Sequence, residues 1–278
     1  MDSYCVMGNP VEHSRSPWIH ARFAALTGQA LTYGRQLIPL DGFAQALAAF
    51  RAAGGMGCNI TVPFKFEAAP LATALTPRAE LAGACNTLRF DGDAVFADNT
   101  DGVGLVNDIQ RNAGVALQGL DLLLVGAGGA AAGVLGPLIE AGPRSIAVAN
   151  RTQDKAAFLI HRHAPLAQAR GVRLLAPELH AIPGSYEVVV NATASSLSGA
   201  GVPVAPGVLA RHALAVDMMY GPAAQGFMDW AASHGAVPRD GLGMLVEQAA
   251  EAFAVWRGVR PPSAQVLAEL RALLAPAA

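Results

Sequence analysis

The chain has 278 residues, of which 53% are hydrophobic and 14% charged, a composition typical of globular proteins and unlike that of disordered ones. Its 19 lysines and arginines nearly balance its 21 aspartates and glutamates, so no basic surface for a phosphate backbone and no nucleic-acid partner are expected. The length exceeds that of most single-core domains and predicts two compact domains.

The cysteines and the N-terminus bear on the cellular compartment. Cys5, Cys58 and Cys85 lie far apart without a CxxC pair, which predicts reduced, buried side chains and no metal site. The N-terminus lacks a basic-then-apolar block, so a cytoplasmic location is expected. The uncharged segment 122–139 nearly reaches membrane-spanning length, but its glycines and its proline favour a strand, a turn and a buried helix. No association with a membrane is expected.

The first hundred residues alternate short apolar runs with amphipathic ones. This pattern predicts strands at 3–8, 31–38 and 57–62, with helices at 17–28 and 42–54 between them. Alternation of strands and helices indicates βαβ units and a mostly parallel sheet.

A second α/β series begins at Leu120 with a strand, a glycine-rich turn and a helix that ends at Ala141. The later elements expected are strands at 145–151, 187–193 and 214–220, a polar helix from Thr152, and C-terminal helices at 241–258 and 263–275. The fold class expected is therefore α/β, with an N-terminal α/β domain and a second domain of the doubly wound, Rossmann type.

The glycine-rich turn after the strand at Leu120 fits the dinucleotide pattern G-x-G-x-x-G/A with Gly126, Gly128 and Ala131. Backbone amides without side chains can approach a pyrophosphate there, and the helix N-terminus adds a partial positive charge. A turn of this kind can also serve only tight packing of a strand against a helix. Its position between a strand and a helix favours dinucleotide binding.

The next strand ends in IAVANRT, where NAD enzymes carry an Asp or Glu for the ribose 2′-hydroxyl. The segment has no carboxylate and instead offers Asn150, Arg151 and Thr152. A guanidinium matches a phosphate through two hydrogen bonds, so the cofactor predicted is NADP. The alternative is that Arg151 only caps or solvates the next helix; Asp154, one turn into it, is expected to be exposed.

Small polar residues gather in the loops that follow the N-terminal strands, where open α/β sheets place ligand-binding groups. Taken singly, each is as well explained as a turn or a helix cap. The residues in question are Ser14, Ser16, Asn59, Thr61, Lys65, Asn86, Thr87, Asn99, Thr100 and Asp101.

The order of these motifs resembles that of the shikimate dehydrogenase family. The matching segments are GNPVEHSRSP, NITVPFK, GACNT, NTDGVG, GAGGAA, NRT, NAT, DMMY and GLGMLVEQA. The similarity runs from Met7 to about Gly258. It implies a substrate domain of residues 1–103 and 240–278, an inserted NADP domain of residues 104–239, and NADP-dependent reversible reduction of 3-dehydroshikimate to shikimate.

The resemblance also implies roles for individual residues, with Lys65 and Asp101 as the catalytic acid-base pair. The small-molecule substrate would be bound by Ser14, Ser16, Asn59, Thr61, Lys65, Asn86, Asp101, Tyr220 and Gln248. The cofactor would be bound by Gly126, Ala127, Gly128, Gly129, Ala130, Asn150, Arg151, Thr152, Met218, Gly241 and Met244. No metal is implied, and the assembly expected is a monomer or a homodimer.

The sequence departs from the family pattern at Ala194 and Ser196, where Ser and Gly are usual, so a cofactor contact by that loop is in doubt. We interpret His13 as a loop or cap residue, and His161 and His163 as solvent-exposed residues of a polar helix.

Three alternatives remain at this point. Lys65 and Asp101 can form an ordinary surface ion pair, the enzyme can be a quinate/shikimate dehydrogenase that accepts NAD, or the chain can be a catalytically silent NADP-binding sensor. The presence of both Lys65 and Asp101 weighs against the sensor.

Overall fold

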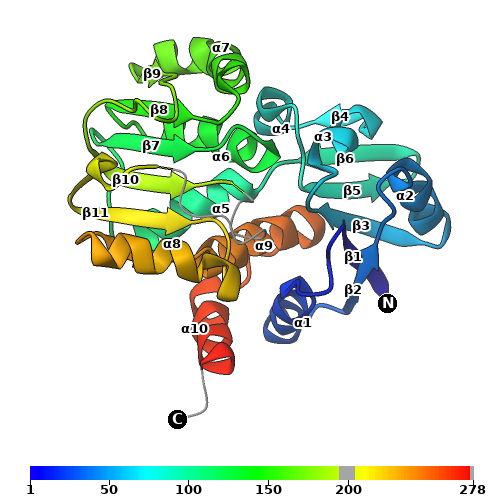
Figure 1. Ribbon diagram of the computed structural model, residues 1–278. Helices are drawn as coiled ribbons and strands as arrows, with labels where there is room; N and C mark the ends of the chain where they lie inside the picture. Colours follow the sequence, from blue (N-terminus) through cyan, green and yellow to red (C-terminus); the bar gives the residue numbers. More distant parts are fainter. Residues whose placement is uncertain (194–203, 276–278) are drawn as a thin grey trace. The chain divides into compact units, whose positions relative to one another are not determined.

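The computed structural model describes residues 1–193 and 204–275, which form two compact units (Figure 1). One unit comprises residues 1–107 and 245–278, and the other comprises residues 108–244. Both boundaries lie a few residues beyond the expected positions at 103 and 240.

The first unit contains a mixed six-stranded sheet in the order β2-β1-β3-β5-β6-β4. Its strands are β1 (Asp2–Gly8), β2 (Leu31–Leu37), β3 (Gly55–Ile60), β4 (Ala74–Leu75), β5 (Thr87–Asp91) and β6 (Ala94–Asp98). Strand β1 pairs in parallel with β2 and β3, and β4 pairs in parallel with β6. Strand β5 is antiparallel to both β3 and β6. The mostly parallel sheet expected for this unit is thus interrupted by one hairpin.

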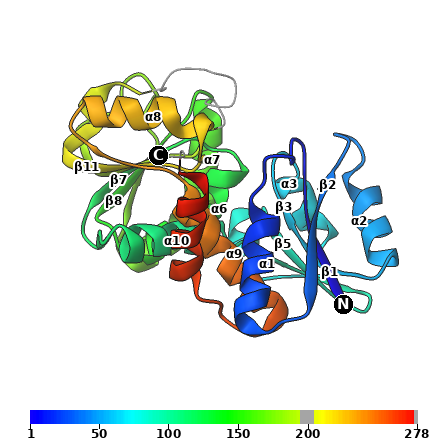
Figure 2. The same cartoon turned by 90° about the horizontal axis from the view of Figure 1, so that it is seen from below.

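Helices α1 (Ser16–Thr27) and α2 (Phe43–Ala52) lie on opposite faces of this sheet (Figure 2). The unit also contains α3 (Lys65–Ala68), α4 (Pro77–Ala82), α5 (Asp101–Asn107), part of α9 (Leu242–Arg257), and α10 (Ser263–Leu274). Cys5 and Met7 face a core that includes side chains of α2 and α3. Tyr4, which points to the opposite face, packs against Trp256 of α9. This alternation follows from the two-residue period of a strand.

The second unit contains a six-stranded, fully parallel sheet in the order β12-β11-β10-β7-β8-β9. Its strands are β7 (Asp121–Val125), β8 (Ser145–Ala149), β9 (Arg173–Leu175), β10 (Tyr186–Asn191), β11 (Leu209–Asp217) and β12 (Val237–Arg239). The chain starts at β7, runs to one edge, returns beside β7 and runs to the other edge. The doubly wound, Rossmann-type order expected is confirmed, and its switch point lies between β7 and β10.

The helices of the second unit are α6 (Gly129–Glu140), α7 (Gln153–Arg170) and α8 (Pro222–Ser233), with a π-helix at Asp108–Asn112 directly after α5. The apolar segment 122–139 forms β7, the turn and most of α6, as expected. Among the described residues, no helix is long and apolar enough to cross a membrane.

Candidate active site

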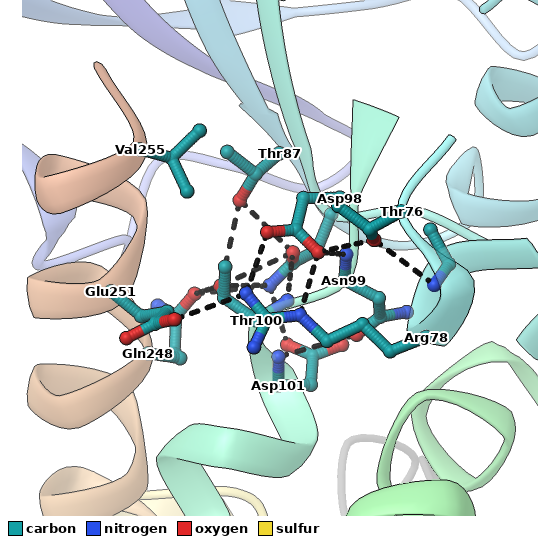
Figure 3. Close-up of polar contacts among 12 residues, drawn as sticks. Thr76, Arg78, Thr87, Asp98, Asn99, Thr100, Asp101, Gln248, Glu251 and Val255 are labelled. Carbon is teal, nitrogen blue, oxygen red and sulfur yellow. Dashed lines mark hydrogen bonds and ion pairs between the residues drawn. The ribbon is translucent and has the colours of Figure 1, made fainter. Parts of the chain in front are cut away.

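The turn between β6 and α5 is fixed by side chains that cap its backbone amides (Figure 3). Asn99 N–H donates to Asp98 Oδ1 at 2.7 Å, and Asp101 N–H donates to Asn99 Oδ1 at 3.2 Å. Between them, Thr100 N–H donates to Asn86 Oδ1 at 2.8 Å. Amides before and in the first helical turn have no partner within the helix, so these caps satisfy them and hold the turn. The turn thereby presents Asp101 at the start of α5.

Asp101 forms an ion pair with Lys65, the first residue of α3. Lys65 Nζ lies 2.5 Å from Asp101 Oδ2, and the side chains are only 15% and 6% exposed. The other carboxylate oxygen, Oδ1, accepts a hydrogen bond from Asn86 Nδ2 at 2.8 Å. Both side chains are therefore mostly buried, and the alternative of an ordinary surface ion pair is wrong.

Gln248 of α9 completes this polar group. Its Oε1 accepts a hydrogen bond from Asn86 Nδ2 at 3.1 Å, and its amide nitrogen donates to Leu245 O. Helix α5 can approach α9 closely because it has a glycine at the crossing: a Cβ at Gly104 would lie 2.6 Å from Gln248 Cβ. The glycine thus brings a residue from the C-terminal part of the chain to the Lys65–Asp101 pair.

Asn59 and the two serines lie at the ends of the parallel strands, but much of their hydrogen-bonding capacity is used within the fold. Asn59 Nδ2 donates to Asn86 O at 3.1 Å and to Thr87 Oγ1 at 3.0 Å, and its Oδ1 accepts from Tyr33. Both amide hydrogens of Asn59 are therefore occupied, and this residue supports Asn86.

Ser14 and Ser16 lie in the loop that follows β1 and at the start of α1. Ser14 Oγ accepts the backbone N–H of Ser16 at 3.3 Å, and the guanidinium of Arg35 donates to Ser14 O at 2.6 and 3.1 Å. Thr61, directly after β3, is partly exposed. Tyr220 belongs to the second unit.

The motifs did not indicate Tyr33 or the ion pair between Arg78 and the buried Asp98. Tyr33 donates to Asn59 Oδ1 at 2.7 Å. Asp98 directly precedes the NTDG segment, and it is 2% exposed. A buried charge cannot be recognised from sequence when its partner lies on another element.

In the second unit, the glycine-rich turn follows β7 at the switch point. Gly126 has a φ of +117°, a conformation that other residues rarely adopt. A Cβ there would also lie 3.1 Å from the carbonyl of Ala192, which follows β10. Gly128 is the N-cap of α6 and is exposed, while Ala127, Gly129 and Ala130 are partly exposed. This geometry leaves the backbone accessible to a diphosphate at a helix N-terminus.

The end of β8 presents Arg151 and Thr152 to solvent, next to the partly exposed Asn150. Asn150 Nδ2 donates to Thr152 O at 2.8 Å and so shapes the turn into α7. A cation and no carboxylate at this strand end fits a ribose 2′-phosphate better than a free hydroxyl. Asp154 is exposed, as expected.

The structure also brings Met218 and Gly241 together. A Cβ at Gly241 would lie 2.3 Å from Met218 O. Met218 N–H donates to Asn191 O at 3.0 Å, and Met244 is buried. Asp217, which directly precedes Met218, accepts hydrogen bonds from Met219 N–H and from Asn191 Nδ2. Burial raises the pKa of Asp217 to about 6, although these hydrogen bonds oppose the shift.

The histidines and cysteines give a mixed outcome. His163 is fully buried and its Nδ1 lies 2.9 Å from Leu159 O, so the prediction of a solvent-exposed residue was wrong. Burial lowers its pKa. His13 and His161 are exposed, and the three cysteines are free and buried, as expected. Ala194 and Ser196 lie outside the described residues.

Comparison with known proteins identifies the family. Residues 6–88 match the family model "Shikimate dehydrogenase substrate binding domain", residues 108–199 match "Shikimate / quinate 5-dehydrogenase", and residues 241–271 match "Shikimate 5'-dehydrogenase C-terminal domain". The shikimate dehydrogenase (NADP(+)) of Paracidovorax citrulli is 68% identical over 98% of both chains. The chain belongs to the shikimate dehydrogenase family. The enzyme of the same name from Acidovorax sp. strain JS42 is 66% identical over 99% of this chain and 97% of its own.

Solved structures share the fold over nearly the whole chain. The Ael1 enzyme of Pseudomonas putida is 43% identical, with a TM-score of 0.87 over 97% of this chain and 98% of its own. The shikimate 5-dehydrogenase of Thermus thermophilus, solved in complex with NADP(H) and shikimate, is 30% identical. Its TM-score is 0.84 over 99% of this chain and 100% of its own.

Proposed function

We propose that this protein is an NADP-dependent shikimate dehydrogenase, which reversibly reduces 3-dehydroshikimate to shikimate in the biosynthesis of chorismate and the aromatic amino acids. The observation that carries the proposal is the enclosed Lys65–Asp101 pair, surrounded by amide side chains, in a chain 66–68% identical to enzymes of that name. Residues 1–107 with 245–278 are assigned to the substrate and residues 108–244 to the cofactor.

The cofactor unit fits a dinucleotide with a 2′-phosphate. The turn at Gly126–Ala130 offers backbone amides to the diphosphate, and Arg151 offers a guanidinium to the 2′-phosphate, assisted by Asn150 and Thr152. Met218, Gly241 and Met244 are assigned to the nicotinamide end. When bound, NADPH supplies the hydride, and the protein supplies orientation and charge.

Lys65 acts on the oxygen at which the reaction takes place. Hydride addition to a ketone places negative charge on its oxygen, so a neighbouring ammonium stabilises the transition state and can deliver a proton. In the direction of shikimate oxidation, the amine of Lys65 accepts the hydroxyl proton. Asp101 holds the ammonium in place and can relay the proton, and Asn86 fixes the carboxylate.

The remaining polar side chains bind the substrate's carboxylate and hydroxyl groups. We assign Ser14, Ser16 and Thr61 to this role, with Asn86, Tyr220 and Gln248. Asn59 acts through Asn86, since its own amide hydrogens are occupied. A buried carboxylate without such partners would cost several kcal/mol.

The test is an absorbance assay of NADPH formation with purified protein and shikimate, run in parallel with NADP and NAD. We expect turnover with NADP and much weaker turnover with NAD. Quinate as substrate separates this function from that of a quinate/shikimate dehydrogenase that accepts NAD, and absence of turnover with every combination would indicate the silent sensor. Cytoplasmic location and assembly as a monomer or homodimer stay predictions from the sequence.

A further inference from the structure

Four side chains of alternating charge are linked in a row next to the turn that carries Asp101: Asp98, Arg78, Glu251 and Arg260. Asp98 accepts two hydrogen bonds from the guanidinium of Arg78, at 2.7 Å from Nε and 2.6 Å from Nη2. Nη2 of Arg78 also lies 3.1 Å from Glu251 of α9, whose other oxygen pairs with Arg260. Asp98 is buried, Arg78 is 27% exposed and Arg260 is 53% exposed, so this row of ion pairs leads from the interior to the surface.

Asp98 is hydrogen-bonded to the backbone of the turn between β6 and α5 that presents Asp101 (the reactive turn). The same Oδ1 that accepts from Arg78 also accepts from Asn99 N–H and from Thr76 Oγ1, both at 2.7 Å. Asn99 in turn caps Asp101 N–H. Figure 3 draws Asp98 together with Arg78, Thr76 and the residues of the turn. A displacement of the Asp98 carboxylate would therefore move the cap of the turn that presents Asp101.

Asp98 and the Lys65–Asp101 pair (the reactive pair) are close enough to affect the same buried side chain. This side chain is Cys85, which is under the electrostatic influence of Lys65, Asp98 and Asp101. Burial raises the pKa of Cys85 to about 12; Lys65 opposes the shift and the two carboxylates add to it. Burial also pushes the pKa of Asp98 upward, but the hydrogen bonds and charge of Arg78 outweigh it, so the pKa falls below its usual value.

We propose that Arg78 and Asp98 are positioning residues of the reaction: together they hold the turn that presents Asp101, and their opposite charges cancel at the Lys65–Asp101 pair. The proposal rests on the proposed function. Either residue alone would leave an uncompensated charge beside the reactive pair, where the low dielectric makes its influence large. Two parallel hydrogen bonds join the guanidinium of Arg78 to the buried carboxylate of Asp98, which compensates the charge of that carboxylate.

Further charged and titratable groups lie on or next to the elements that hold the Lys65–Asp101 pair or are hydrogen-bonded to them. They include Arg78 and Glu80 of α4, Cys85 before β5, Asp98 at the end of β6, Glu67 of α3, Glu251 of α9, and Arg260 after it. Two of these are joined to the turn: Asp98 by a hydrogen bond to its backbone, and Arg78 through the carboxylate of Asp98.

The test compares the pH dependence of shikimate oxidation in Arg78→Gln, Asp98→Asn and the double variant. Loss of a positive charge makes a proton at the site harder to remove, so the pH–rate profile of Arg78→Gln should move to higher pH. Asp98→Asn should move it to lower pH. We expect shifts of about half a unit or more in each direction, a fall in kcat of roughly ten-fold in both, and a profile near its original position in the double variant.

The control is Arg22→Gln, which breaks a bidentate pair with Glu269 in the same unit, at 2.6 and 2.8 Å. It should leave kcat and the profile unchanged. Arg78→Lys keeps the charge but not the two parallel hydrogen bonds, and should retain the original profile with reduced kcat. A loss of folded protein that is equal at every pH lowers the profile without moving it, and thermal unfolding measured at each pH shows whether a variant meets that condition.

Shifts in the same direction, or losses of kcat without any shift, would overturn the positioning role and leave Arg78 and Asp98 as residues of stability alone. A wild-type protein that fails to oxidise shikimate would instead overturn the proposed function.

Discussion

Replacement of Lys65 by Met tests the chemistry most directly. The change keeps the length and apolar character of the stem but removes the charge and the exchangeable proton. Because the oxygen that Lys65 serves changes its charge most on the way to the transition state, the loss should appear mainly in kcat. Acid-base assistance is typically worth about 10²–10⁴-fold, so kcat for shikimate oxidation should fall by at least about 10²-fold.

The Lys65→Met variant should also lose unfolding free energy, and the structure indicates how much. Without Lys65, Asp101 keeps its hydrogen bond from Asn86 but loses its cation while remaining enclosed. Breaking a buried pair by removing one partner costs about 3–5 kcal/mol, and the partial exposure of Lys65 places this variant at the lower end. Lys65→Met with Asp101→Asn removes both charges and should recover most of that loss.

The assay is steady-state kinetics with shikimate and NADP, combined with thermal unfolding of each variant. Asp101→Asn should lower kcat to a similar extent, and the double variant should lose far less than the product of the two effects, since the residues act as one unit. The KM for NADP should not change. If Lys65→Met raised the KM for shikimate and left kcat intact, the lysine would serve only in binding and the acid-base pair would have to be abandoned.

Three further results are expected. Arg151→Ala should weaken NADP binding at least ten-fold, or about 1.4 kcal/mol, with little effect on NAD; equal losses measured by cofactor titration would make Arg151 structural. Replacement of Ser14 and Ser16 together by Ala should raise the KM for shikimate about ten-fold, and an unchanged KM would remove this loop from the site. Because the folded-state pKa of Asp217 is raised from 3.8 to about 6, its carboxylate destabilises the fold at neutral pH, and this cost falls as the pH drops from about 6 toward 3.8. The unfolding free energy of the wild type relative to Asp217→Asn, from denaturant titrations, should therefore rise between pH 7 and pH 5; a constant difference would contradict the shift.

The burial of His163 in α7 could have been predicted from the spacing of the apolar residues in that helix. In α7 the buried residues are Ala156, Leu159, His163 and Ala167, which are spaced three, four and four residues apart. This spacing is the apolar stripe of a helix that packs on a sheet, so it assigns His163 to the buried side. We interpreted His163 from its polar neighbours instead of from its place in the period.

A local signal also existed for the β5–β6 hairpin, which the predicted elements omit. Asp91, Gly92 and Asp93 connect two short apolar runs, and Gly92 has a φ of +58°. Asp-Gly between such runs is typical of a tight hairpin turn. The hairpin places Asn86 and Asp98 side by side before and after it, where Asn86 N–H donates to Asp98 O at 3.1 Å. Its omission therefore hid how the substrate loops come together.

The two units differ in how far their polar groups could be assigned from sequence. In the unit of residues 108–244, the groups that we propose for the cofactor are backbone amides after β7 and side chains after β8, and a parallel sheet brings the ends of adjacent strands together. Local sequence is enough to propose them. In the substrate unit, the reactive turn is held by hydrogen bonds from side chains on other elements, such as Asn86 and, through Asp98, Arg78. The approach of Gln248 depends on the absence of a side chain at Gly104, which lies far earlier in the chain. Such contacts depend on the three-dimensional packing of distant segments, so the motif residues could be named from sequence while their supporting residues could not.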